Sequence, residues 1–237
     1  MIYKIESKQN QKIKDLMKLS QSRFSKETKQ FRIEGFHALE MAKESGALVS
    51  VFVTKPVASL DVPQYLVSEE IMEYISVAKS PQGVVCVCNF IKEKPIFSDK
   101  VLLLDNINDP GNLGTLLRTA LAFGYKDVIL LGGCSQYNEK VLQSTQGAIF
   151  SLNILNNFDY KKLKDFELLA TDLKGNVDLS TLSRIPRHIL VLGNEAHGVS
   201  NDILKIADKR VKINIENIDS LNVAIAGAIA MYHLSKN

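Results

Sequence analysis

Short apolar runs alternate with segments of helical spacing through the second half of the chain. Helices are predicted between the runs, because apolar residues recur there at intervals of three and four. Uniformly apolar strands separated by helices are typical of a parallel sheet covered by helices on both faces. The strands are predicted at 101–104, 128–131, 168–171, 189–192 and 211–215, and the helices at 115–123, 139–145, 160–165 and 200–207.

The first part of the chain predicts a smaller α/β unit. Its strands are predicted at 49–53, 64–67 and 83–90, and its helices at 8–32, 38–44 and 68–78. The polar segment IKEKPIFSDK follows, contains a proline and has no periodicity, so it is predicted to be a linker. We therefore expect a small α/β domain at 1–92, a linker at 93–100 and a larger α/β domain at 101–237.

The last helix is predicted within the segment 213–234, after a short strand and a polar turn. Asp219 or Ser220 is the predicted N-cap, since either side chain can accept a hydrogen bond from the first helical turn. The helix is rich in alanine and contains Gly227, so we expect it to pack closely against strands or a second subunit. Backbone N–H groups at this junction of strand and helix would face a ligand crevice.

Composition indicates the cellular compartment and argues against a membrane span and a metal site. The chain is 46% apolar and 23% charged, as in ordinary globular proteins, and no apolar run reaches the roughly 18 residues of a membrane span. The polar N-terminus does not resemble a secretory signal, so we expect a cytoplasmic protein without a membrane partner. Cys86 and Cys88 share one face of a strand and lack further ligands at metal spacing, which favours small core residues over a metal site.

Positive charge is concentrated at the beginning of the chain. Residues 1–32 carry nine basic and three acidic side chains, whereas the remaining residues carry 20 basic and 23 acidic ones. A basic leader on a mildly acidic body indicates a polyanionic partner. A solvated helix face rich in lysine is the alternative, and charge alone does not decide between them.

The polar residues that follow the predicted strands are the candidates for chemistry. An open α/β sheet binds its ligand beyond the carboxyl ends of its strands. The loop 105–114 is rich in Asn, Gly and Pro, and Arg118 is expected about one turn into the next helix, where it could reach a phosphate or hydroxyl or lie on the surface. In the loop 193–200, Glu195 could pair with Arg118 or accept a proton, and His197 could be a turn residue.

Three common signatures are missing from the sequence. It has no G-x-x-x-x-G-K-[ST] loop, no strand followed by G-x-G-x-x-G, and no G-x-S-x-G elbow. These absences disfavour phosphate hydrolysis on a P-loop, a standard dinucleotide fold and a serine hydrolase. From the residues alone we predict an α/β enzyme with a crevice, three polar loops after strands and a basic leader.

Taken together and in order, the three polar loops resemble the SpoU (TrmH-type) RNA 2′-O-ribose methyltransferases of the SPOUT superfamily. The resemblance covers residues 101–237, with Ala196 at a position where many members have glycine. The three motifs are Asn112-x-Gly114-x-x-x-Arg118-Thr119-Ala120, Leu192-Gly193-Asn194-Glu195-x-x-Gly198-Val199-Ser200 and Ser220-Leu221-Asn222-Val223-Ala224.

The resemblance implies a fold, a cofactor and partners. It implies that the carboxyl-terminal segment forms a trefoil knot in the parallel-sheet domain, an exception to the rule that chains are unknotted. It implies a homodimer acting on RNA, with S-adenosylmethionine held largely by backbone groups. The cofactor-binding residues it implies are Thr171, Leu192, Gly193, Asn194, Gly198, Ile213, Leu221 and Val223.

The first ninety residues carry a second resemblance. Two separate motifs are similar to the small ribosomal-protein-like substrate-binding domain that many of these enzymes possess. They are Phe31-x-Ile33-Glu34-Gly35 and Ser80-Pro81-Gln82-Gly83. The extra domain favours ribosomal RNA as substrate over transfer RNA.

The resemblance also implies a catalytic set made of Arg118, Asn112, Glu195, Ser220 and Asn222. In the proposal made for the family, the arginine accepts the proton of the attacking ribose 2′-hydroxyl. A guanidinium stays protonated in proteins, so we prefer that Arg118 orients the target phosphate and stabilises the incipient alkoxide. The other four would position the arginine, the ribose and the methionine moiety.

Two rival functions belong to other classes. A non-catalytic RNA-binding or ribosome-assembly factor could have the same fold, although the presence of Arg118, Glu195 and Asn222 argues against lost activity. A small-molecule α/β enzyme is disfavoured by the basic leader. Titration with S-adenosylmethionine and the salt dependence of RNA binding distinguish these possibilities.

Overall fold

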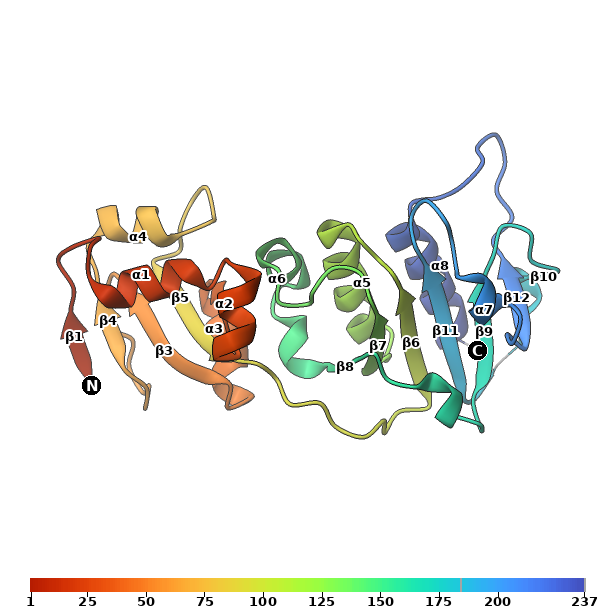
Figure 1. The fold of residues 1–237 in the computed structure, drawn as a ribbon, viewed down its shortest axis with the longest axis horizontal. Helices are drawn as coiled ribbons and strands as arrows, with labels where there is room; N and C mark the ends of the chain where they lie inside the picture. Colours follow the sequence, from red (N-terminus) through yellow and green to blue (C-terminus); the bar gives the residue numbers. More distant parts are fainter. Residues whose placement is uncertain (184, 237) are drawn as a thin grey trace. The chain divides into compact units, whose positions relative to one another are not determined.

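The chain folds into two compact units, each built around its own sheet (Figure 1). The structure is a computed structural model and describes residues 1–183 and 185–236. Unit 1 comprises Met1–Lys92 and Tyr137–Phe150, and unit 2 comprises Glu93–Gln136 and Ser151–Asn237. No helix in the described part of the chain is both long enough and apolar enough to cross a membrane.

Unit 1 contains a mixed five-stranded sheet. The strand order is β1-β4-β3-β5-β2; β4 pairs in parallel with β1 and β3, and β5 pairs antiparallel with β3 and β2. The strands are β1 (Ile2–Lys4), β2 (Gln30–Glu34), β3 (Leu48–Val53), β4 (Gln64–Leu66) and β5 (Val84–Asn89). The helices are α1 (Gln11–Lys18), α2 (Ser22–Thr28), α3 (Phe36–Glu44), α4 (Glu69–Ile75) and α6 (Glu139–Thr145).

Helices α1 and α4 supply the apolar side chains that cover one face of this sheet. Ile13 and Leu16 of α1 and Met72 of α4 pack in one cluster with Phe52 of β3, and all four are buried. Cys86 and Cys88 are also completely buried in β5, as their positions on one strand face predicted. Burial raises the pKa of the Cys86 thiol to about 12, which suits an inert core residue.

The single helix predicted over 8–32 is wrong. Helix α1 ends at Lys18, α2 ends at Thr28, and the chain then enters β2. Lys29 takes the left-handed conformation with φ of 52°, which stops α2 and turns the chain into the strand. Phe31 and Ile33 alternate with polar residues as strand residues do, but helical spacing upstream hid this short pattern.

Unit 2 contains a seven-stranded sheet in which every pair of neighbours is parallel, as predicted. The strand order is β10-β12-β9-β11-β6-β7-β8. Strand β11 lies between β6 and β9, so the carboxyl ends of strands distant in sequence lie side by side. The strands are β6 (Lys100–Asp105), β7 (Asp127–Leu131), β8 (Asn153–Asn156), β9 (Glu167–Thr171), β10 (Val177–Asp178), β11 (His188–Gly193) and β12 (Lys209–Lys212).

Helices cover both faces of this sheet, as predicted. On one face, Val101 and Leu103 of β6 pack in a cluster with Ile203 of α7 (Asn201–Leu204). The other face carries α5 (Pro110–Ala122) and α8 (Val223–Lys236), which pack against each other (Figure 1). A Cβ at Gly227 of α8 would lie 2.5 Å from Leu116 of α5 and 2.6 Å from Leu192 of β11, so glycine permits this close approach.

Several boundaries in unit 2 differ from the prediction. Helix α5 begins at Pro110 rather than at residue 115, because Asp109 caps it and Pro110 suits the first helical position. Only a 3-10 turn, Tyr160–Lys162, forms within the helix predicted at 160–165, and the last strand ends at Lys212 instead of residue 215. The short strands β8 and β10 were not predicted.

The N-cap of α8 also differs from the prediction. The Asn222 side chain accepts hydrogen bonds from the N–H groups of Ala224 at 2.9 Å and Ile225 at 3.3 Å, so Asn222 caps the helix in place of Asp219 or Ser220. The helix therefore begins within the third sequence motif, at Val223. The trefoil knot stays a prediction.

Candidate active site

The first motif begins in the amino-terminal turn of α5 and continues along the helix. The Asp109 side chain accepts a hydrogen bond from the Asn112 N–H at 2.8 Å and fixes this turn. Asn112 is therefore a helical residue in the first turn rather than a loop residue, and its side chain is partly exposed. The Asn112 side chain thus projects from a capped helix end, which fixes its position.

The second motif meets the first through Glu195. The Asn112 side chain donates a hydrogen bond to the Glu195 carboxylate at 3.0 Å. The N–H groups of Asn108 and Asp109 donate to the same carboxylate at 3.3 and 3.2 Å. A carboxylate at the start of a helix is stabilised by its free N–H groups and by the helix dipole.

These hydrogen bonds decide the ionisation of Glu195. Burial pushes the pKa of Glu195 upward, but hydrogen bonds from the Asn112 side chain and from backbone N–H groups, those of Asp109 and Asn108 included, hold the pKa below its ordinary value. Glu195 is therefore an ionised acceptor that fastens its loop to α5. The predicted options of pairing with Arg118 or accepting a proton are both disfavoured by this arrangement.

The third motif joins the same chain of hydrogen bonds. The Asn222 side chain donates to the Asn112 side-chain oxygen at 2.9 Å, while its own oxygen caps α8. Glu195, Asn112 and Asn222 are thereby connected in series, although 83 and 110 residues separate Asn112 from the other two. The three sequence motifs meet at one place in unit 2.

The predicted cofactor residues lie at the carboxyl ends of adjacent strands. Thr171 ends β9, and its hydroxyl donates to the Val191 carbonyl of β11 at 2.9 Å. Leu192 and Gly193 end β11 and are buried. A Cβ at Gly193 would overlap the backbone of Gly198 and Val199, so the loop after β11 folds back tightly onto the strand end.

The remaining predicted residues precede or begin α8. Ile213 follows β12, Leu221 lies in the segment before the helix, and Val223 is the first helical residue; all three are partly buried. Ser220 is exposed in the same segment. Since β12 pairs with β9, this segment starts from a strand end adjacent to Thr171.

The loop of the second motif is held by Asn194. Its side-chain amide donates to the Asn106 carbonyl at 2.8 Å, and its side-chain oxygen accepts from the N–H groups of Ala196 and His197 at 2.9 and 3.1 Å. The positive φ of this turn falls on Gly198, at 69°, and not on Ala196. Alanine at position 196 is therefore free of the backbone strain that a positive φ would impose there.

A polar cavity of about 390 Å³ lies between the loops of the first two motifs. Asp105 is buried at the end of β6, and its carboxylate accepts from the Ser200 N–H at 2.7 Å and so ties the two loops together. The lining residues are Asp105, Asn106, Asn108, Asn194, His197, Gly198, Val199, Ser200 and Asn201.

Arg118 lies outside this cluster. It is exposed on α5 and forms no hydrogen bond or ion pair with any residue that the structure describes. Its position is more than two turns into the helix instead of one, because α5 begins at Pro110. The guanidinium is therefore available to a ligand or to another chain.

Sequence reasoning missed Asp105, Asn108 and Asp109 as contributors to the site. Two signals were present in the sequence. An acidic residue ends the apolar strand VLLLD, and an Asp-Pro pair is typical of an N-cap followed by the first helical position. The backbone contacts of Asn108 with Glu195 have no sequence signal, because they depend on the meeting of two distant loops.

Two family models match separate regions of the chain. The model of the SpoU rRNA Methylase family matches residues 99–232. The model of the MRM3-like substrate binding domain matches residues 10–86. The first match contains all three motifs, and the second contains both motifs noted in the first ninety residues.

Individual relatives match almost the whole chain. The 23S rRNA (guanosine(2553)-2′-O)-methyltransferase RlmP of Bacillus subtilis is 33% identical, over 97% of this chain and 98% of that protein. An AdoMet-bound rRNA methyltransferase from Sinorhizobium meliloti superposes with a TM-score of 0.88 and 27% identity, over 99% of this chain and 98% of that one. A crystal structure of an RNA 2′-O ribose methyltransferase gives a TM-score of 0.84 and 26% identity over the same shares.

Proposed function

Since the chain belongs to the SpoU rRNA methylase family, we propose that it transfers a methyl group from S-adenosylmethionine to a ribose 2′-hydroxyl of ribosomal RNA. The observation that carries this proposal is the series of hydrogen bonds from Glu195 through Asn112 to Asn222. It unites the three motifs beside the carboxyl ends of β9, β11 and β12. The names of the relatives support both the ribose 2′-oxygen and ribosomal RNA.

The strand ends suit S-adenosylmethionine by their chemistry. None of the eight proposed cofactor residues is charged, so backbone carbonyl and N–H groups around Gly193, Ile213 and Leu221 would make the contacts. An uncharged wall places no additional cation next to a sulfonium. When bound, the cofactor supplies an electrophilic methyl group. The loops that carry these residues are fixed by Asn194 and Asn222 before any ligand arrives.

Arg118 is the proposed catalytic residue. As the 2′-oxygen bonds to the methyl carbon, the carbon–sulfur bond breaks and the hydroxyl proton passes to solvent. Negative charge develops on the oxygen during this step, and a guanidinium next to it lowers the energy of that charge. The planar fork of Arg118 can also bind the adjacent phosphate in two places. Asn112, Glu195, Ser220 and Asn222 position the ribose, the cofactor and the loops around them.

Replacement of Arg118 tests this role. We expect R118A to lower the turnover number at saturating RNA by about 100-fold or more, the effect of removing one preorganised donor from a developing oxyanion. R187A is the matched control, because the Arg187 side chain is 48% exposed and precedes β11, at the opposite end of that strand from Gly193, and its turnover should stay within twofold of wild type. Turnover of R118A within a few-fold of wild type would contradict the proposal.

A non-catalytic RNA-binding factor is the alternative class. Calorimetric titration with S-adenosylmethionine separates the two, since only an enzyme of this kind requires the cofactor. We expect heat of binding and competition by the demethylated product. A titration without heat, combined with intact RNA binding, would favour the non-catalytic factor.

The choice of substrate is tested by comparing RNA classes. The second domain and the name of the Bacillus relative favour ribosomal RNA over transfer RNA. Methyl acceptance should therefore be higher for purified ribosomal RNA than for transfer RNA from a strain that lacks the gene. Preferential methylation of transfer RNA would reverse this assignment.

The proposed division of labour follows the predicted domains. Residues 1–92 would bind RNA, 93–100 would link, and 101–237 would carry the methyl transfer. Several basic residues of the leader, Lys14, Lys26 and Lys29 among them, have no acidic partner within the described residues and remain available to phosphates. We expect the protein to act in the cytoplasm, where its RNA substrate would be.

The active form is proposed to be a homodimer. Helix α8 exposes a stripe of large apolar side chains one turn apart, namely Ile225, Ile229 and Tyr232, with exposed fractions of 52%, 40% and 46%. Such a stripe is unusual on a surface that stays in water. Neighbouring α5 carries the unpaired Arg118, so a second copy on this face could also bring an arginine to the site.

A further inference from the structure

The two motifs noted in the first ninety residues meet at a cavity in unit 1. The cavity has a volume of about 560 Å³, within the range typical of small-molecule sites. The Gln82 side-chain oxygen accepts the N–H of Phe36 at 3.2 Å, and the Gly35 N–H donates to the Val84 carbonyl at 3.2 Å. Residues 31–35 and 80–83 therefore form one structure beside the amino-terminal end of α3.

The walls of the cavity combine apolar and amide groups. Ile33, Ala38 and Leu142 provide apolar surface, and Gln82 and Gln143 provide amides that can both donate and accept. The Gln143 side chain has no hydrogen-bond partner among residues 1–183 and 185–236. A flat ring with polar edges, such as a nucleobase, fits walls of this kind.

The floor of the cavity is fixed by charged groups that are already paired. Buried Arg32 forms an ion pair with Glu139 of α6 and donates to the Ile75 carbonyl at 2.8 Å. Glu34 accepts from the Ser76 hydroxyl at 2.5 Å and from the Val77 N–H at 2.6 Å. These contacts hold β2, α4 and α6 together, so the cavity is preformed and its floor presents no unpaired charge.

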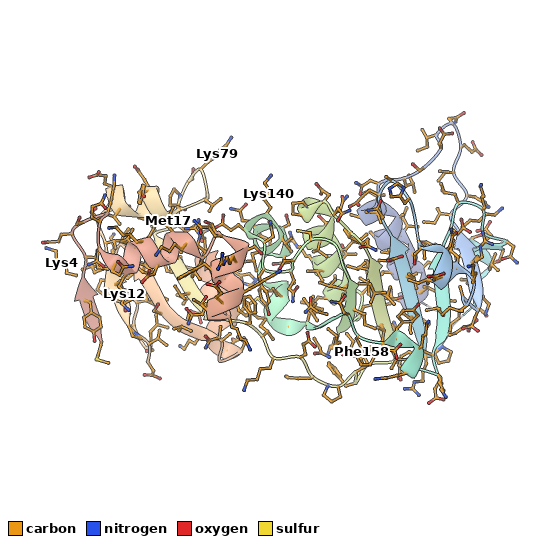
Figure 2. The ribbon with its side chains drawn as sticks, viewed as in Figure 1. Lys4, Lys12, Met17, Lys79, Lys140 and Phe158 are labelled. Carbon is orange, nitrogen blue, oxygen red and sulfur yellow. The ribbon has the colours of Figure 1, made fainter. Side chains whose placement is uncertain are left out.

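Lys79 is a positively charged lining residue that stays available to a ligand. It lines the cavity, is exposed, and has no ion-pair partner in the part of the chain that the structure describes. Lys140 of α6 adjoins the lining residue Glu139, and in Figure 2 the side chains of Lys79 and Lys140 extend to the same side of unit 1. A phosphate at the rim of the cavity would meet Lys79.

An exposed aromatic residue flanks the cavity lining in sequence. Phe36 lies between the lining residues Gly35 and His37, and 47% of it is exposed. Large aromatic rings at a surface are the usual platforms on which unstacked RNA bases lie. The ring, the amide-lined cavity and a lysine at its rim are the three contacts that one nucleotide requires.

We infer that this cavity holds one unstacked nucleotide of the RNA, with the base among the glutamine amides, Phe36 stacked against it and the phosphate at Lys79. The inference rests on the proposed function to the extent that the ligand is RNA. A free nucleoside diphosphate or triphosphate suits the cavity less well, because the floor charges are paired and the described lining lacks a second free lysine or arginine.

Photo-crosslinking and binding test this inference together. The full chain is irradiated with large-subunit ribosomal RNA that contains 4-thiouridine, and the crosslinked peptides are identified by mass spectrometry. Affinity for the same RNA is measured for F36A, A78W, in which an exposed lining residue is enlarged to fill the cavity, and K79A. The controls are F97A, an exposed phenylalanine of unit 2, and K43A, at the other end of α3.

The inference predicts crosslinks at residues of the cavity and its rim, such as Phe36, His37 and Val77. F36A and A78W should weaken RNA binding about tenfold, the order of a lost base–aromatic stack, and K79A should reduce the slope of log affinity against log salt by about one. F97A and K43A should bind within twofold of wild type. Thermal midpoints report whether each variant folds, and the crosslinks are read on the wild-type chain.

Three results would overturn the inference. These are crosslinks in unit 1 that avoid the cavity, binding by both F36A and A78W within twofold of wild type, and displacement of the RNA by micromolar nucleoside monophosphate, which would indicate a diffusible ligand. Methyl transfer is measured on the same RNA. Methylation with unchanged variant binding defeats only this inference, whereas cavity crosslinks without methylation by wild type defeat only the proposed function.

Discussion

Asn112 donates a hydrogen bond to Glu195 and accepts one from Asn222, so a single amide side chain links two loops that are far apart in sequence. The order of donors matters. Glu195 can only accept while ionised, and Asn222 uses its oxygen to cap α8, so Asn112 must present its nitrogen to one and its oxygen to the other. Aspartate at position 112 would place two carboxylates together.

His188 gives a pH prediction at the residue scale. It is buried at the start of β11, with its ring nitrogens 2.7 Å from the Tyr125 hydroxyl and 2.8 Å from the Ile185 carbonyl. Burial lowers the pKa of His188; the hydrogen bond to Ile185 opposes this shift, and Lys100 adds to it. The unfolded chain, with a pKa of about 6.5, therefore takes up the proton first on acidification.

Stability contributed by neutral His188 is thus complete above about pH 6.5 and is lost as the pH falls toward the lower folded-state pKa. We expect the thermal midpoint of wild type to fall more between pH 7.5 and 5.5 than that of H188Q, which is less stable but lacks this titration. Equal falls in the two proteins would show that His188 is not the group responsible.

At the scale of elements, two variants of the α8 N-cap residue Asn222 distinguish its effect on stability from its effect on catalysis. N222A removes the cap and should lower the free energy of unfolding by about 1 kcal/mol. N222D keeps a capping oxygen but loses the donor to Asn112. Both variants should show slower methyl transfer, whereas only N222A should be clearly destabilised. Chemical unfolding measures the stability of each variant, and turnover at saturating RNA measures its catalysis. Normal turnover by N222D would show that the hydrogen bond from Asn222 to Asn112 is not needed for methyl transfer.

Elements could be predicted where one local pattern dominated. Four strands of unit 2 were predicted because each is a compact apolar run, namely β6, β7, β9 and β11, and α6 was predicted at its observed bounds. The predicted helix at 115–123 starts too late because Asn112 and Gly114 resemble loop residues, although the Asp109-Pro110 pair already indicates the observed start of α5. The two-residue strand β10 depends on pairing with β12 and has no pattern of its own.

In the candidate site, the residues could be identified from sequence motifs, but the contacts between distant loops could not. Motif order identified Asn112, Glu195 and Asn222, and the structure brings them together. No local pattern could show that Glu195 binds the start of α5 rather than Arg118, because that choice depends on how two loops meet. The buried role of Asp105 likewise depends on the loop that carries Ser200.

At the scale of the whole molecule, compact units do not follow the order of the chain. The segment Tyr137–Phe150 packs with unit 1, where the Tyr137 ring stacks on Phe90 at 3.8 Å and its hydroxyl accepts the Ile91 N–H at 2.9 Å. The order of residues along the chain does not indicate that this segment packs with unit 1. The knot and the functional division into domains remain predictions.

The proposed dimer is tested on the exposed stripe of α8. Glutamates at two of its positions, in I225E/I229E, would place charge in an apolar interface and should give a monomer by sedimentation velocity, with methyl transfer reduced at least tenfold. I206E is the matched control, because Ile206 is 47% exposed elsewhere in unit 2. A fully active monomer, or a dimer unaffected by both glutamates, would exclude α8 as the interface.

The central claim is that three motifs form one site for methyl transfer to a ribose 2′-oxygen, and nucleoside mass spectrometry tests it most directly. Ribosomal RNA from a strain without the gene is incubated with the protein and S-adenosylmethionine, then digested to nucleosides. We predict one additional 2′-O-methylated nucleoside with wild type and none with R118A. A methyl group on a base, or no transfer by a protein that binds the cofactor, would contradict the account.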